Sequence, residues 1–207
     1  MPLTLHLHPL SSYCHKVLFA LYENATPFTP AILNPGDYAA REPFLTQWPI
    51  AKFPLLEDTA RKHVIPESSI IIEYLDQHYP GPTKFIPTDP DRARETRMWD
   101  RFFDLHIHHH MQSIIGDRLR PADKKDPLTV AQARVKIKTG LDFLERNIGS
   151  DWVMSKAFTM ADCPAAPALF YADKITPFGG THPEVAAYLA RLMGRPSYER
   201  VLQEAEP

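Results

Sequence analysis

Hydrophobic and polar residues alternate strictly at the start of the chain. Every second residue from Leu3 to Leu7 is leucine, and polar residues stand between them. This period of two predicts a β-strand. Pro9 ends the strand, and Ser11-Ser12 offers N-cap chemistry for a helix that continues through Leu21.

The same reasoning divides the rest of the first 79 residues into short elements. We expect a strand over 28–33, a polar loop with a short helix over 34–48, strands over 53–57 and 62–65, and a helix opening at 66–68. Pro30 within the second strand favours a position at the sheet edge. The order βαβ followed by ββα predicts a thioredoxin-like α/β domain.

A proline-rich segment over 80–90 then interrupts the pattern and indicates a linker between domains. The residues after it follow helical spacing. One predicted face carries Met98, Phe102, Leu105 and His109, and another carries Ile137, Leu141, Leu144 and Ile148. The expected organisation is therefore a thioredoxin-like domain over 1–79, the linker over 80–90, and an all-α domain over 91–207.

A capping signal lies within the helical half. Thr159 stands three residues before Asp162, as in a capping box, and Phe158 and Cys163 occupy the positions of a hydrophobic staple. We expect a buried helix to begin here. Loss of the Thr159 cap would cost about 1 kcal/mol.

Composition excludes several classes of protein. The 23 basic and 25 acidic side chains leave a formal charge of -2, which gives no basis for nucleic-acid or anionic-membrane binding. No apolar stretch approaches the ~20 residues that span a bilayer, and the first residues lack the features of a signal peptide. Only Cys14 and Cys163 are present, so we expect no disulfide framework and a cytoplasmic location.

Four motifs, taken in order, resemble the cytosolic, bacterial-type glutathione transferase family along essentially the whole chain. They are the serine-type turn Ser11–Val17, the loop Lys52-Phe53-Pro54, the pair Glu67-Ser68 and the capping box Thr159–Asp162. Each motif alone is weak, but four in this order are specific. The resemblance implies glutathione as co-substrate, detoxification as the role, and a homodimer.

The implied chemistry depends on a serine hydroxyl. A thiol with a pKa of about 8.5 is mostly protonated at neutral pH, whereas the thiolate is the nucleophile. A hydroxyl that donates a hydrogen bond to sulfur stabilises the thiolate, and the positive end of a helix dipole adds to this effect. Ser11 matches the family's catalytic serine. Ser12 is the alternative, and a plain N-cap is the non-functional interpretation of Ser11.

Cys14 completes a C-x-x-C spacing whose first cysteine is replaced by Ser11. The replacement argues against disulfide chemistry, although the helix N-terminus could activate Cys14 in part. A small residue packed beside the site is the simpler interpretation.

The resemblance also implies which residues bind the rest of glutathione. The Phe53 backbone would pair with the cysteinyl unit if the bond to Pro54 is cis, which the sequence does not show. Glu67 and Ser68 would receive the γ-glutamyl end, and Lys52 would pair with the glycyl carboxylate. Capping by Glu67 and Ser68, and a solvated Lys52, are the alternatives.

A cluster of histidines lies in the helical half. His106 and His110 are four residues apart and could bind zinc together, but the neighbouring residues complete no ligand set, so we expect no metal. We place them, together with Tyr13, at the hydrophobic-substrate site.

Four functions remain open. The first is transfer of the glutathione thiolate to an electrophilic, mostly apolar substrate. The second is glutathione-dependent isomerisation or dehalogenation, because the Ser-Ser-x-Cys turn is similar to that of the maleylacetoacetate isomerase class. The third is a non-catalytic glutathione-fold binding protein. The fourth is a glutaredoxin-like reductase that uses Cys14.

Overall fold

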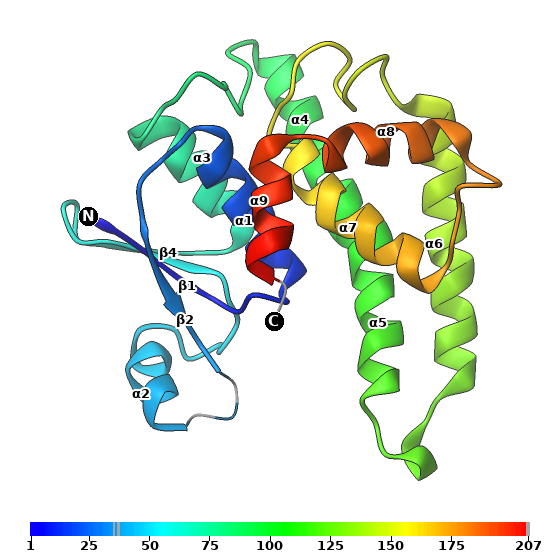
Figure 1. The fold of residues 1–207 in the computed structure, drawn as a ribbon, viewed down its shortest axis with the longest axis horizontal. Coiled ribbons are helices and arrows are strands. Elements are labelled where there is room, and N and C mark those ends of the chain that lie inside the picture. Colours follow the sequence, from blue (N-terminus) through cyan, green and yellow to red (C-terminus); the bar gives the residue numbers. More distant parts are fainter. Residues whose placement is uncertain (35, 37, 206–207) are drawn as a thin grey trace. The chain divides into compact units, whose positions relative to one another are not determined.

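The computed structural model describes residues 1–34, 36 and 38–205, except the side chains of 38–41. Contacts divide the chain into two compact units. The first comprises residues 1–86 and the C-terminal residues from Arg195, and the second comprises residues 87–194. The last helix, α9 (Pro196–Ala205), packs against α1 of the first unit (Figure 1), so the helical unit does not include the whole of the predicted range 91–207.

The first unit contains a four-stranded sheet in the order β2-β1-β3-β4. Its strands are β1 (Leu3–Leu7), β2 (Thr29–Ile32), β3 (Leu55–Asp58) and β4 (His63–Pro66). β1 runs parallel to β2 and antiparallel to β3, and β4 is antiparallel to β3. This arrangement confirms the predicted thioredoxin-like fold. Pro30 lies in the edge strand β2, where a missing backbone donor is tolerated.

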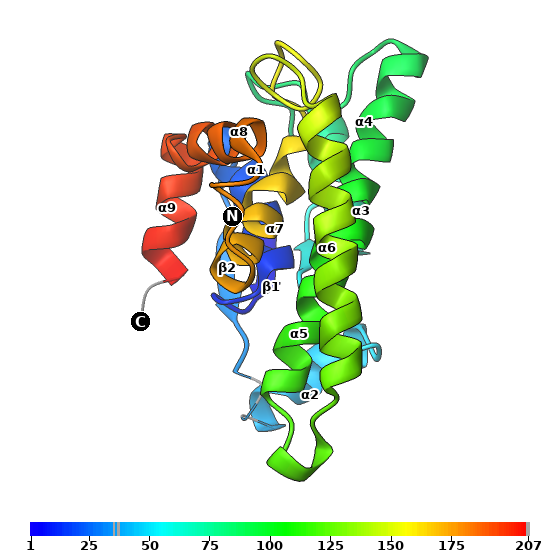
Figure 2. The same ribbon diagram turned by 90° about the vertical axis from the view of Figure 1, so that its right-hand side faces the viewer.

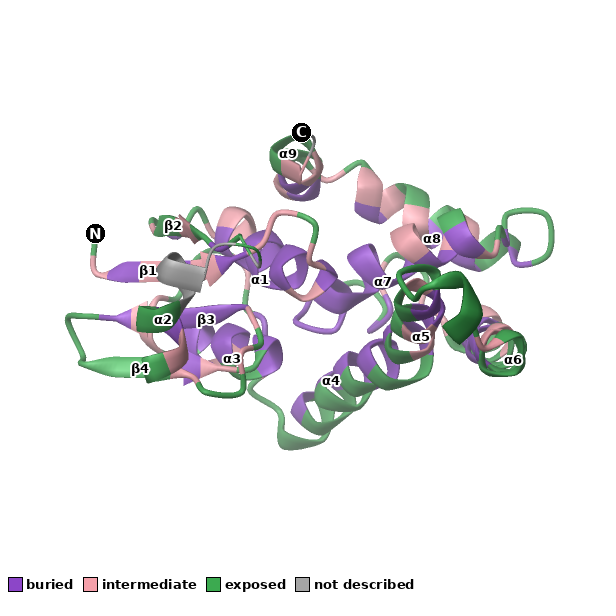
Figure 3. Cartoon of the chain, turned by 90° about the horizontal axis from the view of Figure 1, so that it is seen from below, coloured by how far each residue is buried: buried purple, intermediate pink, exposed green. Residues whose placement is uncertain are grey.

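Three further helices pack in this unit: α1 (Ser12–Glu23), α2 (Tyr38–Gln47) and α3 (Ser68–His78). The leucines of β1 are buried, and Figure 3 shows α1 as buried along most of its length. The opposite face of the sheet carries His6, whose ring lies 5.7 Å from that of Phe44 of α2. Part of the segment expected as loop and short helix is thus the ten-residue helix α2, and residues 35 and 37 lie outside the described residues.

The second unit is all-helical, as predicted. Its elements are α4 (Pro90–Phe102), the π-helix η1 (Phe103–His108), α5 (His109–Arg118), the 3₁₀-helix η2 (Ala122–Lys124), α6 (Pro127–Asn147), α7 (Asp162–Ile175) and α8 (Pro183–Met193). α5 and α6 lie side by side (Figure 2), and α7 packs against η1.

The segment that carries Met98, Phe102, Leu105 and His109 is helical, as predicted, but the face that these residues share is not the buried one. Of these four residues only Phe102 is buried. The buried residues that continue from α4 into α5 are instead Trp99, Phe103, Ile107 and Met111, each four positions after the last. After Phe102 the π-helix η1 also departs from α-helical spacing, because its i→i+5 bonding widens the turn.

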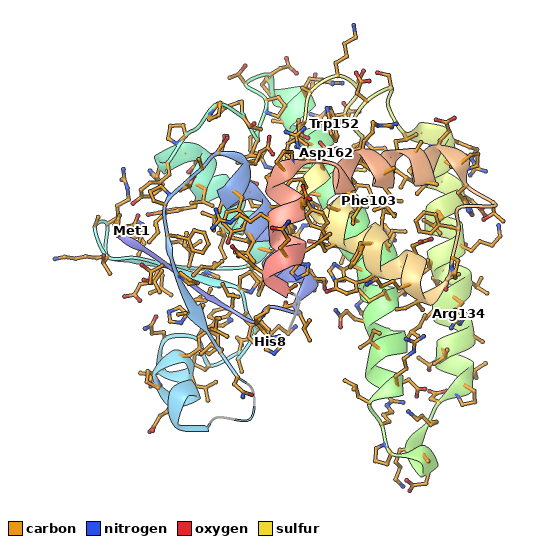
Figure 4. The ribbon with its side chains drawn as sticks, in the orientation of Figure 1. Met1, His8, Phe103, Arg134, Trp152 and Asp162 are labelled. Atoms are coloured by element: carbon orange, nitrogen blue, oxygen red, sulfur yellow. The ribbon has the colours of Figure 1, made fainter. Side chains whose placement is uncertain are left out.

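The predicted capping box before α7 is present in part: the bond from the Thr159 N–H to Asp162 is formed, but the helix begins at Asp162 and its N-cap residue is Ala161, not Thr159. The Thr159 N–H donates to Asp162 Oδ2 at 2.8 Å, and Thr159 Oγ1 accepts from the Ala161 N–H at 3.3 Å. Asp162 is completely buried, and its Oδ1 also accepts from the Val153 N–H (3.1 Å) and the Tyr188 hydroxyl (2.6 Å). Figure 4 labels Asp162 close to Trp152, the neighbour of Val153. A local capping motif thus also anchors the 151–155 loop and α8.

Candidate functional site

Strand register brings three predicted motifs to one end of the sheet. His6, near the end of β1, pairs with Leu55 at the start of β3, and Leu55 pairs with Pro66 at the end of β4. The loop before α1, the loop before β3 and the start of α3 therefore all meet at this end. The structure thus brings the loop before α1 to two segments that lie more than 40 residues further along the chain.

Ser11 is the N-cap of α1. Its backbone is extended, its N–H donates to the His8 carbonyl at 3.0 Å, and its Oγ accepts from the Cys14 N–H at 3.4 Å. Accepting this bond leaves the hydroxyl proton of Ser11 able to donate to another atom. Ser11 is half-buried, whereas Ser12 is 2% exposed within the first turn. Of the two serines, Ser11 is the one that an incoming ligand can reach.

Cys14 is fully buried, with no exposed surface. Burial raises the pKa of its thiol to about 11, and hydrogen bonds involving Ser11 and the His8 backbone only partly oppose this shift. A buried thiol with a raised pKa is a poor nucleophile. This environment favours the interpretation of Cys14 as a packing residue.

The Phe53–Pro54 bond is cis, which the sequence left open. The ring of Phe53 stacks on His8, with centroids 5.8 Å apart and planes 18° from parallel. His8 Nδ1 also accepts the Leu10 N–H at 3.2 Å. His8, labelled in Figure 4, thus connects the loop before α1 with the loop before β3. Lys52, beside Phe53, is exposed to solvent.

Glu67 lies immediately before α3 with φ 69° and ψ 121°, a left-handed backbone that is uncommon for a residue other than glycine. Its side chain is exposed and makes no capping hydrogen bond to the helix. Ser68 begins α3 and is buried. The first backbone N–H groups of a helix lack intrahelical partners, so the start of α3 is suited to bind a carboxylate.

Two contacts near the site were not anticipated from the sequence. One is the stacking of His8 on Phe53. The other joins the buried Lys16 of α1 to α3, because its Nζ donates to Ser69 Oγ at 2.8 Å. This bond spans 53 positions of sequence, and no local pattern points to it.

The predicted hydrophobic-substrate residues lie in different units. Tyr13 is a half-buried residue of α1, whereas His106 is exposed in η1, with its ring 5.6 Å from that of Phe102. The pKa of His110 in α5 is lowered by partial burial and by the charges of His109, His106 and Lys136. The assignment of Tyr13, His106 and His110 to one substrate site therefore stays a prediction.

The part of the chain that the structure describes offers neither a metal-binding cluster nor a membrane-spanning helix. Among residues 1–34, 36 and 38–205, no group of three or more histidine, cysteine, aspartate or glutamate side chains is arranged to hold a metal ion. Within the same residues, no helix is both long and apolar enough to cross a membrane.

Family comparisons match both units. Residues 5–83 match the family model of the glutathione S-transferase N-terminal domain, and residues 127–191 match that of the C-terminal domain. The chain belongs to the glutathione S-transferase family. The predicted family and fold class are both confirmed.

Three individual relatives share 25–30% of their residues with this chain. The chain is 30% identical to the glutathione S-transferase-like protein LUC7 of a Fusarium species over 62% of the chain and 58% of that relative's length. It is 25% identical to a stringent starvation protein A homolog of Pasteurella multocida, over 99% of the chain and 92% of the relative. A solved glutathione S-transferase of Methylobacterium radiotolerans, in complex with glutathione sulfonate, is 28% identical with a TM-score of 0.83, covering 96% and 93% of the two chains.

These relatives establish the family and not one activity. Both glutathione transferases and stringent starvation proteins are among the relatives in this family.

Proposed function

We propose that this protein is a glutathione transferase that binds glutathione at the Ser11 end of the sheet. The bound thiol would be held as a thiolate and added to an electrophilic, mostly apolar second substrate. The solved relative in complex with glutathione sulfonate supports a glutathione site in a chain of this kind.

The observation that carries the proposal is the state of Ser11. Its hydroxyl is reachable, it stands at the positive end of α1, and its proton is not consumed by the capping bond. A thiolate placed there would accept a charge-assisted hydrogen bond worth about 1.5–3 kcal/mol. A pKa lowered by two units requires about 2.7 kcal/mol, so this bond together with the helix terminus is sufficient.

The other parts of glutathione would be bound by the residues that lie at the same end of the sheet as Ser11. The γ-glutamyl carboxylate would bind the backbone N–H groups at the start of α3 and the Ser68 hydroxyl, and the exposed Glu67 carboxylate would accept from the ammonium group. The Phe53 backbone would pair with the cysteinyl unit, and Lys52 is free in solvent to meet the glycyl carboxylate.

The decisive experiment titrates the thiolate absorbance of glutathione bound to the protein. We expect the bound thiol of the parent protein to have a pKa well below that of free glutathione. Ser11→Ala should raise this pKa by about one to two units, because one charge-assisted hydrogen bond is lost. Ser12→Ala is the matched control and should leave the pKa unchanged.

Two results would contradict the assignment. If Ser12→Ala raises the thiol pKa and Ser11→Ala does not, the neighbouring serine is the donor. If Cys14→Ala abolishes activity and Ser11→Ala leaves it intact, the protein is a glutaredoxin-like reductase.

A second function is favoured by one comparison. The stringent starvation protein A homolog matches nearly the whole chain, which supports a non-catalytic glutathione-fold protein as the alternative. The same titration separates the two functions: a bound thiol with the pKa of free glutathione supports the non-catalytic protein. Product analysis with halogenated and unsaturated electrophiles then distinguishes conjugation from dehalogenation or isomerisation.

We also propose that the protein forms a homodimer. Large apolar side chains are exposed in each unit, Val64 and Ile70 in the first and Met98 and Leu105 in the second. Apolar side chains that are exposed in one copy of a chain can become buried in an interface with a second copy. Light scattering on the purified protein tests this proposal, and a monomer at micromolar concentration would refute it.

A further inference from the structure

A histidine side chain that the proposed function leaves without a role lies beside Ser11. Residues 8–11 form a β-turn, which is closed by the bond from the Ser11 N–H to the His8 carbonyl at 3.0 Å. The first and last residues of a β-turn lie within about 7 Å of each other, measured between their Cα atoms. His8, labelled in Figure 4, is therefore held close to the serine that is proposed to face the glutathione sulfur.

The hydrogen bonding of His8 determines which ring nitrogen carries the proton. Nδ1 accepts the Leu10 N–H at 3.2 Å, so Nδ1 itself carries no hydrogen. A neutral imidazole with an accepting Nδ1 carries its hydrogen on Nε2, which is then a donor. Within residues 1–34, 36 and 38–205, no group accepts a hydrogen bond from His8 Nε2. The ring is half-buried, as Ser11 is, so this donor is available to a ligand at the same site.

Stacking fixes the orientation of the His8 ring from the other side. The ring lies against Phe53, with centroids 5.8 Å apart and planes 18° from parallel. Phe53 in turn packs on an apolar cluster of buried residues, Leu33, Phe44 and Leu55. The Phe53 backbone is the group proposed to pair with the cysteinyl unit of glutathione, which carries the sulfur. The ring thus lies between the two groups that are proposed to bind this unit and its thiolate.

We propose that His8 is a second hydrogen-bond donor to the glutathione thiolate, acting through its Nε2–H beside the Ser11 hydroxyl. The inference rests on the proposed function, because it concerns the same bound thiolate. Nε2 keeps its hydrogen throughout, and the bond favours the charged form of the sulfur over the neutral thiol. His8 and Ser11 each account for part of the lowered pKa of the bound thiol.

Support of Phe53 by stacking is the other role open to the His8 ring. A ring that only supports Phe53 affects how tightly glutathione binds and leaves the ionisation of its thiol unchanged. A donor to the sulfur changes the thiol pKa itself, because it stabilises one of the two protonation states. The two roles can be separated by experiment, since the ring and its N–H can be removed independently.

The test measures two quantities for each variant of the full chain. Calorimetry gives the affinity for S-methylglutathione, which has no thiol to ionise and therefore reports on binding alone. The thiolate absorbance of bound glutathione gives the pKa of its thiol.

Two substitutions of His8 separate the ring from the donor. His8→Phe keeps the stacked ring and removes the donor. We expect an affinity for S-methylglutathione close to that of the parent and a thiol pKa raised by about one unit, as for the loss of one of two charge-assisted hydrogen bonds. His8→Gln keeps an N–H donor and removes the ring, so the affinity should fall by about two- to tenfold and the thiol pKa should rise less.

His63→Phe is the matched control. His63 is an exposed histidine of β4 that pairs with Asp58 at the opposite end of the sheet from Ser11. Both measured quantities should equal those of the parent.

The outcomes distinguish this proposal from the proposed function. If the bound thiol of the parent has the pKa of free glutathione, the proposed function fails and the role of His8 fails with it. If Ser11→Ala raises the thiol pKa and His8→Phe leaves it unchanged, only the role of His8 is overturned. Equal increases in His8→Phe and His8→Gln would also overturn it, because both variants lose the Nδ1 acceptor of the Leu10 N–H and that loss would then be the cause.

Discussion

Gly140 stands in the interior of the 21-residue helix α6, where glycine costs about 1 kcal/mol relative to alanine. Its absent side chain allows α6 to approach η1 closely. A Cβ at this position would lie 2.7 Å from Ile107 Cδ1 and 3.1 Å from the His106 carbonyl oxygen. Gly140→Ala would therefore have two opposite effects on stability: the helix propensity of α6 would improve, and the new methyl group would clash with the π-helix η1.

The magnitude follows from a matched substitution. Gly116 lies in α5, and a Cβ there would meet no atom within 4 Å. Gly116→Ala should therefore stabilise the protein by about 0.5–1 kcal/mol, since only the helix propensity changes. Overpacking of a core costs about 1–3 kcal/mol, so Gly140→Ala should be destabilising by up to about 2 kcal/mol.

Urea unfolding followed by circular dichroism measures the free energy of unfolding of both variants. In thermal unfolding, a change of 1 kcal/mol corresponds to about 2–4 °C in the melting temperature of a chain of this size. Ile107→Val removes the Cδ1 atom and should reduce the cost of Gly140→Ala in a double-mutant cycle. If Gly140→Ala stabilises as much as Gly116→Ala, the close approach of α6 to η1 is absent and the reasoning is wrong.

Two further predictions concern the first unit. His8→Ala removes the ring stacked on Phe53 and should weaken glutathione binding by about two- to tenfold, because an aromatic pair contributes about 0.5–1.5 kcal/mol; His8→Phe should restore most of the affinity in calorimetry, and an unchanged affinity in His8→Ala would contradict this positioning role. Burial alone would raise the pKa of Asp58, but hydrogen bonds from Tyr79, Tyr74 and two backbone N–H groups hold it below its usual value. The stability that Asp58 provides is therefore complete above its unfolded pKa of about 3.9 and is lost as the pH falls through the folded value. Urea unfolding across the acid range should show this loss in the parent and not in Asp58→Asn, and equal pH profiles would refute it.

The sequence by itself determined the features that depend on neighbouring residues. The alternation in β1, the N-cap at Ser11 and the bond between Thr159 and Asp162 are all formed within a few positions, and each is where it was predicted. The order of helices and strands was also predicted from the sequence. It indicated the fold, and the four motifs indicated the family. For the candidate site, the sequence predicted that Ser11 and Glu67 stand at helix starts and that Phe53 precedes a strand, while their roles stay predictions.

Tertiary structure decided what depends on distant residues. The stacking of His8 on Phe53, the bond from Lys16 to Ser69 and the packing of α9 on α1 join segments separated by 45 to more than 170 positions. The π-helix η1 changes the residue spacing after Phe102, and α-helical periodicity in the sequence did not indicate it. Periodicity indicates which side of a helix or strand is apolar. The residues that this side contacts elsewhere in the fold depend on strand register and packing, and no local sequence pattern specifies them.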